Sequence, residues 1–204
     1  MILGTWALVL LLAGPAQASP PERPAPARPG LSWADADALA RALGDVEKSF
    51  KAGKPAKGRR LVVTESQLNS YLNLTLAPKM PPGLSDVVVQ LGGGGLVARA
   101  TVDLDRVPLK RPTDGAWSLY SLLTGVVPVE IRGRLESVDG VGTLDLEEAR
   151  LGGWPVPAAL VAQVVSSSTR SASSPQGFDI RAPFRLPYAA RRVQFEPGRA
   201  VVDF

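Results

Sequence analysis

The chain of 204 residues contains no cysteine and no histidine. Without cysteine there are no disulfides, no thiolate metal ligands and no thiol redox chemistry. Without histidine, the Ser-His-Asp and Cys-His catalytic sites and the ordinary zinc sites are excluded too. We therefore expect stability to come from packing, and we expect neither a cofactor nor a metal.

The chain also lacks a large excess of charge of either sign. Its 23 basic and 19 acidic side chains leave a formal net charge of +4. A balance of this size favours contact with an anionic membrane surface. It is too small to indicate nucleic-acid binding, so we expect no nucleic acid among the partners.

The first 18 residues carry no charged side chain. An apolar run at 2–13 is followed by Gly14-Pro15 and by Ala16-Gln17-Ala18, the order typical of a secretory signal peptide and its cleavage site. The run is shorter than the roughly 20 residues that cross a bilayer. We expect a signal peptide over 1–18 and a protein exported to the periplasm or another part of the cell envelope. An uncleaved membrane anchor is the alternative.

Residues 19–31 are rich in proline and alanine, which predicts an extended tether. A single domain is then expected over 32–204. Apolar residues at helical spacing predict a helix over 33–51, with Ser32 as its N-cap. Thr64 and Gln67 form a capping box that opens a short helix ending near Leu74.

A basic segment, 51–60, joins these two helices. One interpretation is a solvated loop. The other is contact with phospholipid headgroups or an acidic partner, for which the candidate membrane-surface residues are Lys54, Lys57, Arg59 and Arg60.

Most of the remaining chain has the patterns of strands. Residues 96–105 and 127–136 alternate between apolar and mostly polar side chains, which predicts strands with one dry face. Gly92–Gly95 predicts a turn after a strand at 86–91. Asp139-Gly140 predicts a hairpin turn into a strand at 143–151.

Irregularities are also predicted. A bulge near Glu147-Glu148 would keep Ala149 and Leu151 on the dry side of their strand. Further strands are expected over 178–186 and 191–204, the latter turning at Pro197-Gly198.

Residues 156–165 differ from the other elements, because Gln163 is their only polar residue. Pro157 suits the first turn of a helix. A helix that is apolar around its circumference must be enclosed. We therefore expect an α+β fold in which a curved antiparallel sheet is wrapped around this helix. Its interior is either a solid core or an apolar groove.

Several stretches together resemble a known family. They are 131–140 (IRGRLESVDG), Leu144-Asp145-Leu146, 151–160 (LGGWPVPAAL), 184–188 (FRLPY) and the closing strand 193–202. This order is similar to that of the LmeA-like bacterial family of envelope phospholipid-binding proteins. Those proteins have the tubular lipid-binding (BPI-like) architecture, a long curved antiparallel sheet rolled around a helix.

The stretch 63–69 (VTESQLN) also resembles the helix opening of related small exported proteins. The likeness covers about 61–204, whereas the helix at 33–51, the basic segment and residues 110–125 depart from the family pattern. The resemblance implies binding of a phospholipid or fatty acid, and its motifs include no catalytic signature.

The expected function is that of an exported, non-catalytic protein that binds or shuttles a lipid acyl chain in an apolar groove. The expected lining residues are Leu68, Leu72, Val156, Leu160, Val164, Phe178 and Phe184. One alternative is a structural or interaction module of the cell envelope with a filled core and a basic surface segment. The sequence gives no indication of the oligomeric state.

Another alternative is a hydrolase built on two carboxylates. Its candidates are Asp103 and Asp105, on the wet face of their strand, and the adjacent pair Glu147 and Glu148. None of these positions gives a reason for catalysis, so we do not expect an enzyme.

Overall fold

The computed structural model describes residues 29–54, 58–106, 125–170 and 174–204, with the side chains of 164, 167 and 168 left out. The predicted signal peptide lies outside the described residues, as do most of the tether, Lys57 and most of 110–125. In chain order the described elements are α2 (Trp33–Lys51), β1 (Arg60–Thr64), α3 (Glu65–Ser70), the π-helix η1 (Tyr71–Thr75), the 3₁₀ turn η2 (Ala77–Lys79), β2 (Leu84–Gly92), β3 (Gly95–Asp103), β4 (Val126–Val138), β5 (Val141–Leu151), β6 (Trp154–Pro155), α4 (Ala158–Ser168), β7 (Phe184–Arg185), the 3₁₀ turn η4 (Pro187–Ala189), β8 (Arg192–Glu196) and β9 (Arg199–Asp203).

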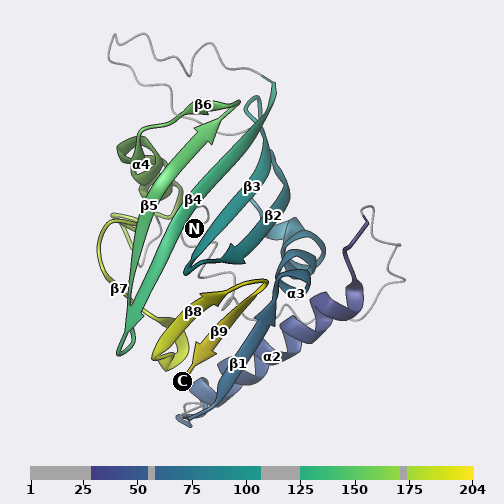
Figure 1. Ribbon diagram of the computed structural model, residues 1–204, viewed down its shortest axis with the longest axis vertical. Coiled ribbons are helices and arrows are strands. Elements are labelled where there is room, and N and C mark those ends of the chain that lie inside the picture. Colours follow the sequence, from purple (N-terminus) through teal and green to yellow (C-terminus); the bar gives the residue numbers. More distant parts are fainter. Residues whose placement is uncertain (1–28, 55–57, 107–124, 171–173) are drawn as a thin grey trace.

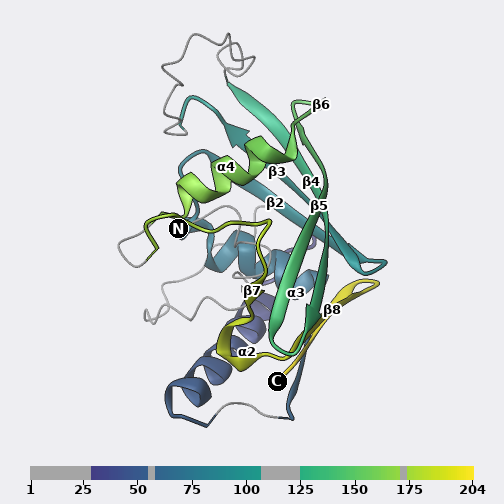
Figure 2. The same ribbon diagram turned by 90° about the vertical axis from the view of Figure 1, so that its left-hand side faces the viewer.

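Two antiparallel sheets lie one above the other along the long axis of the molecule (Figure 1). The upper sheet has the order β2-β3-β4-β5-β6, with β7 paired to the lower end of β5. The lower sheet has the order β1-β9-β8. Helices α2, α3 and α4 all lie on one side of these sheets (Figure 2). The α+β class with an antiparallel sheet is thus confirmed. We call the helix side of the upper sheet its inner face and the opposite side its outer face.

The main core lies where α2, α3 and η1 pack onto the lower half of the molecule. Leu39 and Leu43 of α2 and Tyr71 and Leu72 of η1 are almost completely buried there, together with Val63 of β1. The capping box of α3 is present, since the Gln67 amide donates to the Thr64 hydroxyl and the Gln67 side chain accepts from the Thr64 amide. Local signals in the sequence therefore begin both helices at the predicted residues.

Most predicted strands are present, and one is not. The Asp139-Gly140 hairpin has both residues at positive φ, as its tight turn requires. The predicted bulge appears as a shift in register opposite Arg132 and Gly133. The strand expected over 178–186 is wrong, because only Phe184–Arg185 pairs with β5. Among the described residues, no helix is both long and apolar enough to cross a bilayer.

Side chains of α3 and η1 occupy the outer edge of β2. The Asn69 carboxamide donates to the Val89 carbonyl at 3.0 Å and accepts from the Val89 amide at 2.7 Å. The Leu91 amide donates to Glu65 at 2.5 Å, and Asn73 donates to the Val87 carbonyl at 2.6 Å. Four residues of helix rise about 6 Å, which matches about 6.6 Å for two residues of strand. The helix therefore takes the place of a neighbouring strand and satisfies an edge that would otherwise invite pairing.

We predict that Asn69→Ala destabilises this edge. Removing the side chain leaves the partly buried amide and carbonyl of Val89 without their partner, which costs about 1–3 kcal/mol. Hydrogen exchange of the Val89 amide should accelerate. Gln67→Ala is the control, because it breaks the capping box but leaves Asn69 in place. After correction for any change in the global free energy of unfolding, the exchange protection of the Val89 amide should equal that of the wild type. Unchanged exchange in Asn69→Ala would contradict the assigned contact.

A second prediction concerns Tyr71. Burial, together with the nearby Tyr188 and Glu47, raises the pKa of its hydroxyl to about 12. The neutral phenol is thus favoured in the folded state, so its stabilising effect is intact below about pH 10 and is lost as the pH rises towards 12. Tyr71→Phe should lose less stability over this range than the wild type, by about 2 kcal/mol. Urea unfolding at a series of alkaline pH values measures the difference, and parallel curves would refute it.

Candidate functional site

The inner face of the upper sheet carries rows of apolar side chains that run across the strands. Directly paired residues share a face, so the register defines each row. One row is Leu91, Leu96, Gly133 and Leu146, and the next is Val89, Ala98, Ile131 and Ala149. Above them lies a third row of Ala100, Val129, Leu151 and Trp154, and then a fourth of Leu84, Val102 and Val127. No charged side chain belongs to any of these four rows.

The two lower rows and the two upper rows differ in burial. Val89, Leu91 and Leu96 are between 3 and 8% exposed, because α3 and η1 lie beside β2 and pack against them. Ala98, Ile131 and Leu146 of the lower rows are half-buried. In the upper rows every residue of β3, β4 and β5 is half-buried and none is fully buried. We call the third and fourth rows together the upper inner face. It is the candidate functional site.

Helix α4 lies beside this face without being enclosed by the sheet. Its described packing is mainly against β5, where Ala162 and Val165 are buried together with Ile180. On its other side Ala158, Ala159 and Gln163 are exposed. The expectation that the sheet is wrapped around this helix is therefore wrong. Two of the apolar residues that suggested enclosure are alanines, whose small side chains expose little apolar area to water.

The last turn of α4 anchors the segment that follows it. The Thr169 hydroxyl donates to the Val165 carbonyl at 2.8 Å and accepts from the Phe178 amide at 2.6 Å. The Ser166 hydroxyl donates to the Gln176 carbonyl at 2.8 Å. Phe178 then meets Phe184 edge to face, with ring centroids 5.3 Å apart. This anchoring fixes both aromatic rings against the β5 side of the inner face.

The seven expected lining residues fall into separate places. Leu68 and Leu72 are 3 and 1% exposed and belong to the lower core. Val156 and Leu160 are half-buried at the start of α4, and the side chain of Val164 lies outside the described ones. Phe178 and Phe184 touch each other, but Phe178 packs on the α4 cluster and Phe184 on the lower core. The structure therefore brings together only part of the expected set.

The described residues of the basic segment lie at the opposite end of the molecule from the upper inner face, where β1 begins in Figure 1. Lys54, Arg59 and Arg60 are exposed, and Lys57 is not described. The Arg60 guanidinium donates to the Asp203 carboxylate at 2.7 Å. This hydrogen bond lowers the pKa of Asp203 and joins β1 to its neighbour β9.

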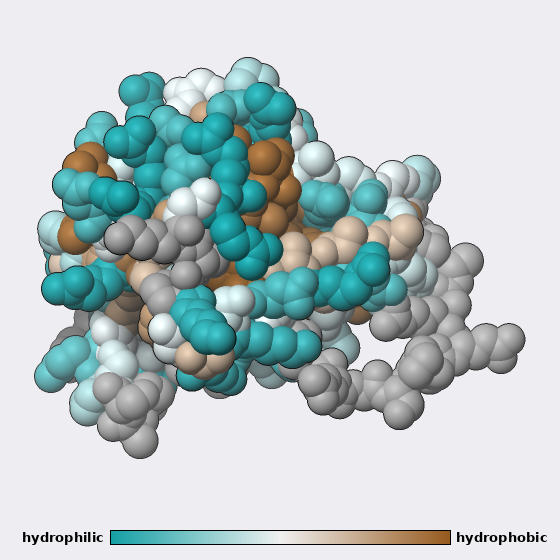
Figure 3. Space-filling model, turned by 90° about the horizontal axis from the view of Figure 1, so that it is seen from below, coloured by the Kyte–Doolittle hydropathy of each residue, from teal (hydrophilic) through white to brown (hydrophobic). Residues whose placement is uncertain are grey.

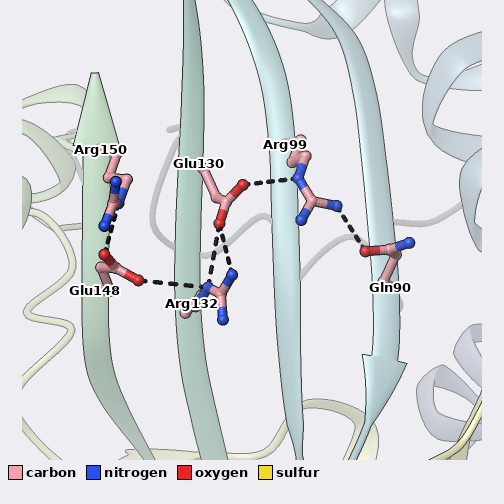
Figure 4. Close-up of polar contacts among 6 residues, drawn as sticks. All are labelled: Gln90, Arg99, Glu130, Arg132, Glu148 and Arg150. Atoms are coloured by element: carbon pink, nitrogen blue, oxygen red, sulfur yellow. Dashed lines mark hydrogen bonds and ion pairs between the residues drawn. The ribbon is translucent and has the colours of Figure 1, made fainter. Parts of the chain in front are cut away.

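The outer face carries the charges. Arg99 donates to Gln90 and to Glu130, Arg132 contacts both Glu130 and Glu148, and Arg150 donates to Glu148 (Figure 4). The bonds from Arg99 and Arg132 lower the pKa of Glu130. The bulge turns both members of the Glu147-Glu148 pair towards arginines, since Glu147 contacts Arg134 at 2.5 Å. These carboxylates thus belong to ion pairs between strands.

Comparisons with known protein families, with curated proteins and with solved structures found no match to this chain. The likeness to the lipid-binding family therefore rests on the stretches of sequence that carry it.

Sequence reasoning found part of the upper inner face and missed the rest. The alternation in β3 and β4 assigned Ala100, Val102, Val127 and Val129 to dry faces, and the register confirms this. Trp154 was missed as a member of the third row. The signal was present, because Gly152-Gly153 is a two-residue turn that places Trp154 opposite Leu151.

We predict that Gly177→Ala releases the segment held by α4. Gly177 has a φ of +74°, and a Cβ there would overlap the carbonyl oxygen of Ser166. Gly198 has the same φ with open space around it, so Gly198→Ala is the matched control for backbone strain alone. Gly177→Ala should cost about 1–3 kcal/mol more in the free energy of unfolding. It should also speed proteolysis between Ser166 and Phe184. Equal losses of unfolding free energy in the two variants would contradict the close packing of Gly177 against Ser166.

Proposed function

We propose that this protein binds the acyl chain of a phospholipid or fatty acid along the upper inner face. The observation that carries the proposal is the third row, Ala100-Val129-Leu151-Trp154, an uncharged line of apolar side chains across four strands. Its first three residues are only half-buried, and Trp154 is exposed. A ligand without charge along its length suits this surface, because the described charges of the same strands are gathered on the outer face.

The finer features of the proposal come from the sequence. We propose that the curved sheet with helices on its inner side is a shortened relative of the tubular lipid-binding architecture. Export to the periplasm or another part of the cell envelope would place the protein where it meets phospholipid. A carrier or a binding protein, with no catalytic step, fits the apolar character of the rows.

The energetics favour a long chain over a short one. Each buried methylene contributes about 0.8 kcal/mol, whereas association costs about 4–15 kcal/mol before any net affinity appears. A ligand therefore needs contact over many methylenes. Affinity should rise about threefold to fourfold for each methylene added, until the chain outgrows the rows.

We predict that Ala100→Trp weakens uptake of a fluorescent fatty acid at least about tenfold, which is the loss expected when two methylenes can no longer be buried. The added ring would fill the third row. Val97→Trp is the matched control, because Val97 is half-buried on the same strand but belongs to an outer-face row with Gln90 and Arg132. It should bind like the wild type.

Lipid extracted from the purified wild type should contain phospholipid or fatty acid by mass spectrometry. The proposal fails if no lipid is found and the delipidated wild type takes up no fatty acid. It also fails if Ala100→Trp and Val97→Trp both bind as the wild type does.

A further inference from the structure

Trp154 is the most exposed large apolar residue among those that the structure describes, at 74%. It stands in β6 at the top of the molecule in Figure 1 and ends the third row, directly opposite Leu151. Val126, which begins β4 at the same end, is 66% exposed. Exposed apolar side chains that lie together, unlike single ones, mark a surface that contacts a partner or a membrane.

The chain around Trp154 has no charge. Residues 151–169 include no Asp, Glu, Lys or Arg, although much of this stretch lies at the surface. Pro155, Pro157, Ala158 and Ala159 are exposed beside the tryptophan. The lower end also exposes apolar residues, which the view from below shows as a brown patch among hydrophilic neighbours (Figure 3). At the Trp154 end the exposed apolar residues follow one another along the chain without a charged residue between them.

We propose that this end of the molecule docks on a phospholipid bilayer, with Trp154 entering the interface between headgroups and acyl chains. Tryptophan is enriched at that depth because its large ring is apolar and its N–H finds a polar partner. Val126 and the start of α4 enter beside it. This inference rests on the proposed function, because the third row then offers an acyl chain a continuous apolar path from the bilayer to the inner face.

The charges at this end favour a bilayer over an acidic partner. The described ionisable groups at the upper ends of β2, β3 and β5 are Asp86, Asp103, Asp105, Arg106 and Arg150. Arg150 already contacts Glu148. Such a balance gives no attraction to anionic groups. Docking through these described residues is therefore driven by apolar burial, and their own contribution does not depend on salt or on the fraction of anionic lipid. The basic residues Lys54 and Arg59 lie at the other end, away from the bilayer.

The test compares Trp154→Glu with Val138→Glu in the full chain. Val138 is 63% exposed beside the Asp139-Gly140 turn at the lower end, so it is an equally exposed apolar residue on the other side of the molecule. Flotation with vesicles of phosphatidylcholine, alone or mixed with phosphatidylglycerol, measures binding. Trp154→Glu should weaken it at least about tenfold, the effect of losing burial of one large apolar side chain. Val138→Glu should bind as the wild type does.

A second readout uses the lack of cysteine in the chain. The single substitutions Val126→Cys and Val138→Cys each accept one environment-sensitive dye. Vesicles should shift the emission of the dye at position 126 to the blue and leave that at position 138 unchanged. The two positions report separately on the two ends, so any binding through residues 2–13 does not imitate the result.

The outcomes separate this inference from the proposed function. With fatty acid supplied as monomer in solution, Val126→Glu should bind as the wild type does, because Val126 pairs with Asp103 and lies outside the acyl-binding rows, while its transfer of fatty acid from vesicles falls with docking. No uptake by the wild type together with intact docking defeats the proposed function alone. The docking proposal is wrong if Trp154→Glu binds vesicles as the wild type does, or if Val138→Glu loses most of its vesicle binding. It is also wrong if the wild type does not bind vesicles. If the wild type does not bind vesicles, the result favours a protein partner as the occupant of the Trp154 surface.

Discussion

The pairing register of β3, β4 and β5 is the constraint on which the rest of this structure depends. Because side chains alternate along a strand, a slip of one residue would exchange the two faces. A slip of β4 would turn Val129 outwards and bring Glu130 to the inner face, away from its partner Arg99 of β3. The register is held from both sides, by apolar rows on one face and by the ion pairs of Figure 4 on the other. Neither set alone specifies the sheet as strongly.

The bulge at Glu147-Glu148 is part of the same constraint. Without it, the alternation that places Leu144 and Leu146 inside would place Ala149 and Leu151 outside. The extra residue resets the phase, so that Ala149 stands opposite Ile131 and Leu151 opposite Val129. It also leaves both glutamates able to reach arginines of β4. A local irregularity therefore joins the lower rows to the upper inner face.

The sequence predicted the features that depend on neighbouring residues. Helix α2 has the expected bounds, with Ser32 as its N-cap, and the strand faces follow the alternation of apolar residues. What it did not predict depends on residues far apart. Asn69 takes the place of a strand beside Val89, and only the fold brings helix and strand edge together. The strand expected at 178–186 failed because the end of α4 holds residues 176–178 and a turn follows, in which the Ala182 amide donates to the Asp179 carbonyl. Only Phe184–Arg185 then pairs with β5.

The sequence predicted the apolar character of the candidate site but not its position in the fold. Apolar residues in 156–165 suggested an enclosed helix, yet the exposed alanines of α4 show that a helix of small apolar residues needs a partner on only one side. The apolar surface that lacks full cover therefore belongs to the sheet and not to the helix. Its residues Ala100, Val129 and Leu151 are half-buried. A folded chain that leaves such a row partly open has forgone stability that a larger helix would have supplied. The acyl chain that we propose as the ligand would supply the missing contacts only when bound, so the same surface could take up its ligand and release it.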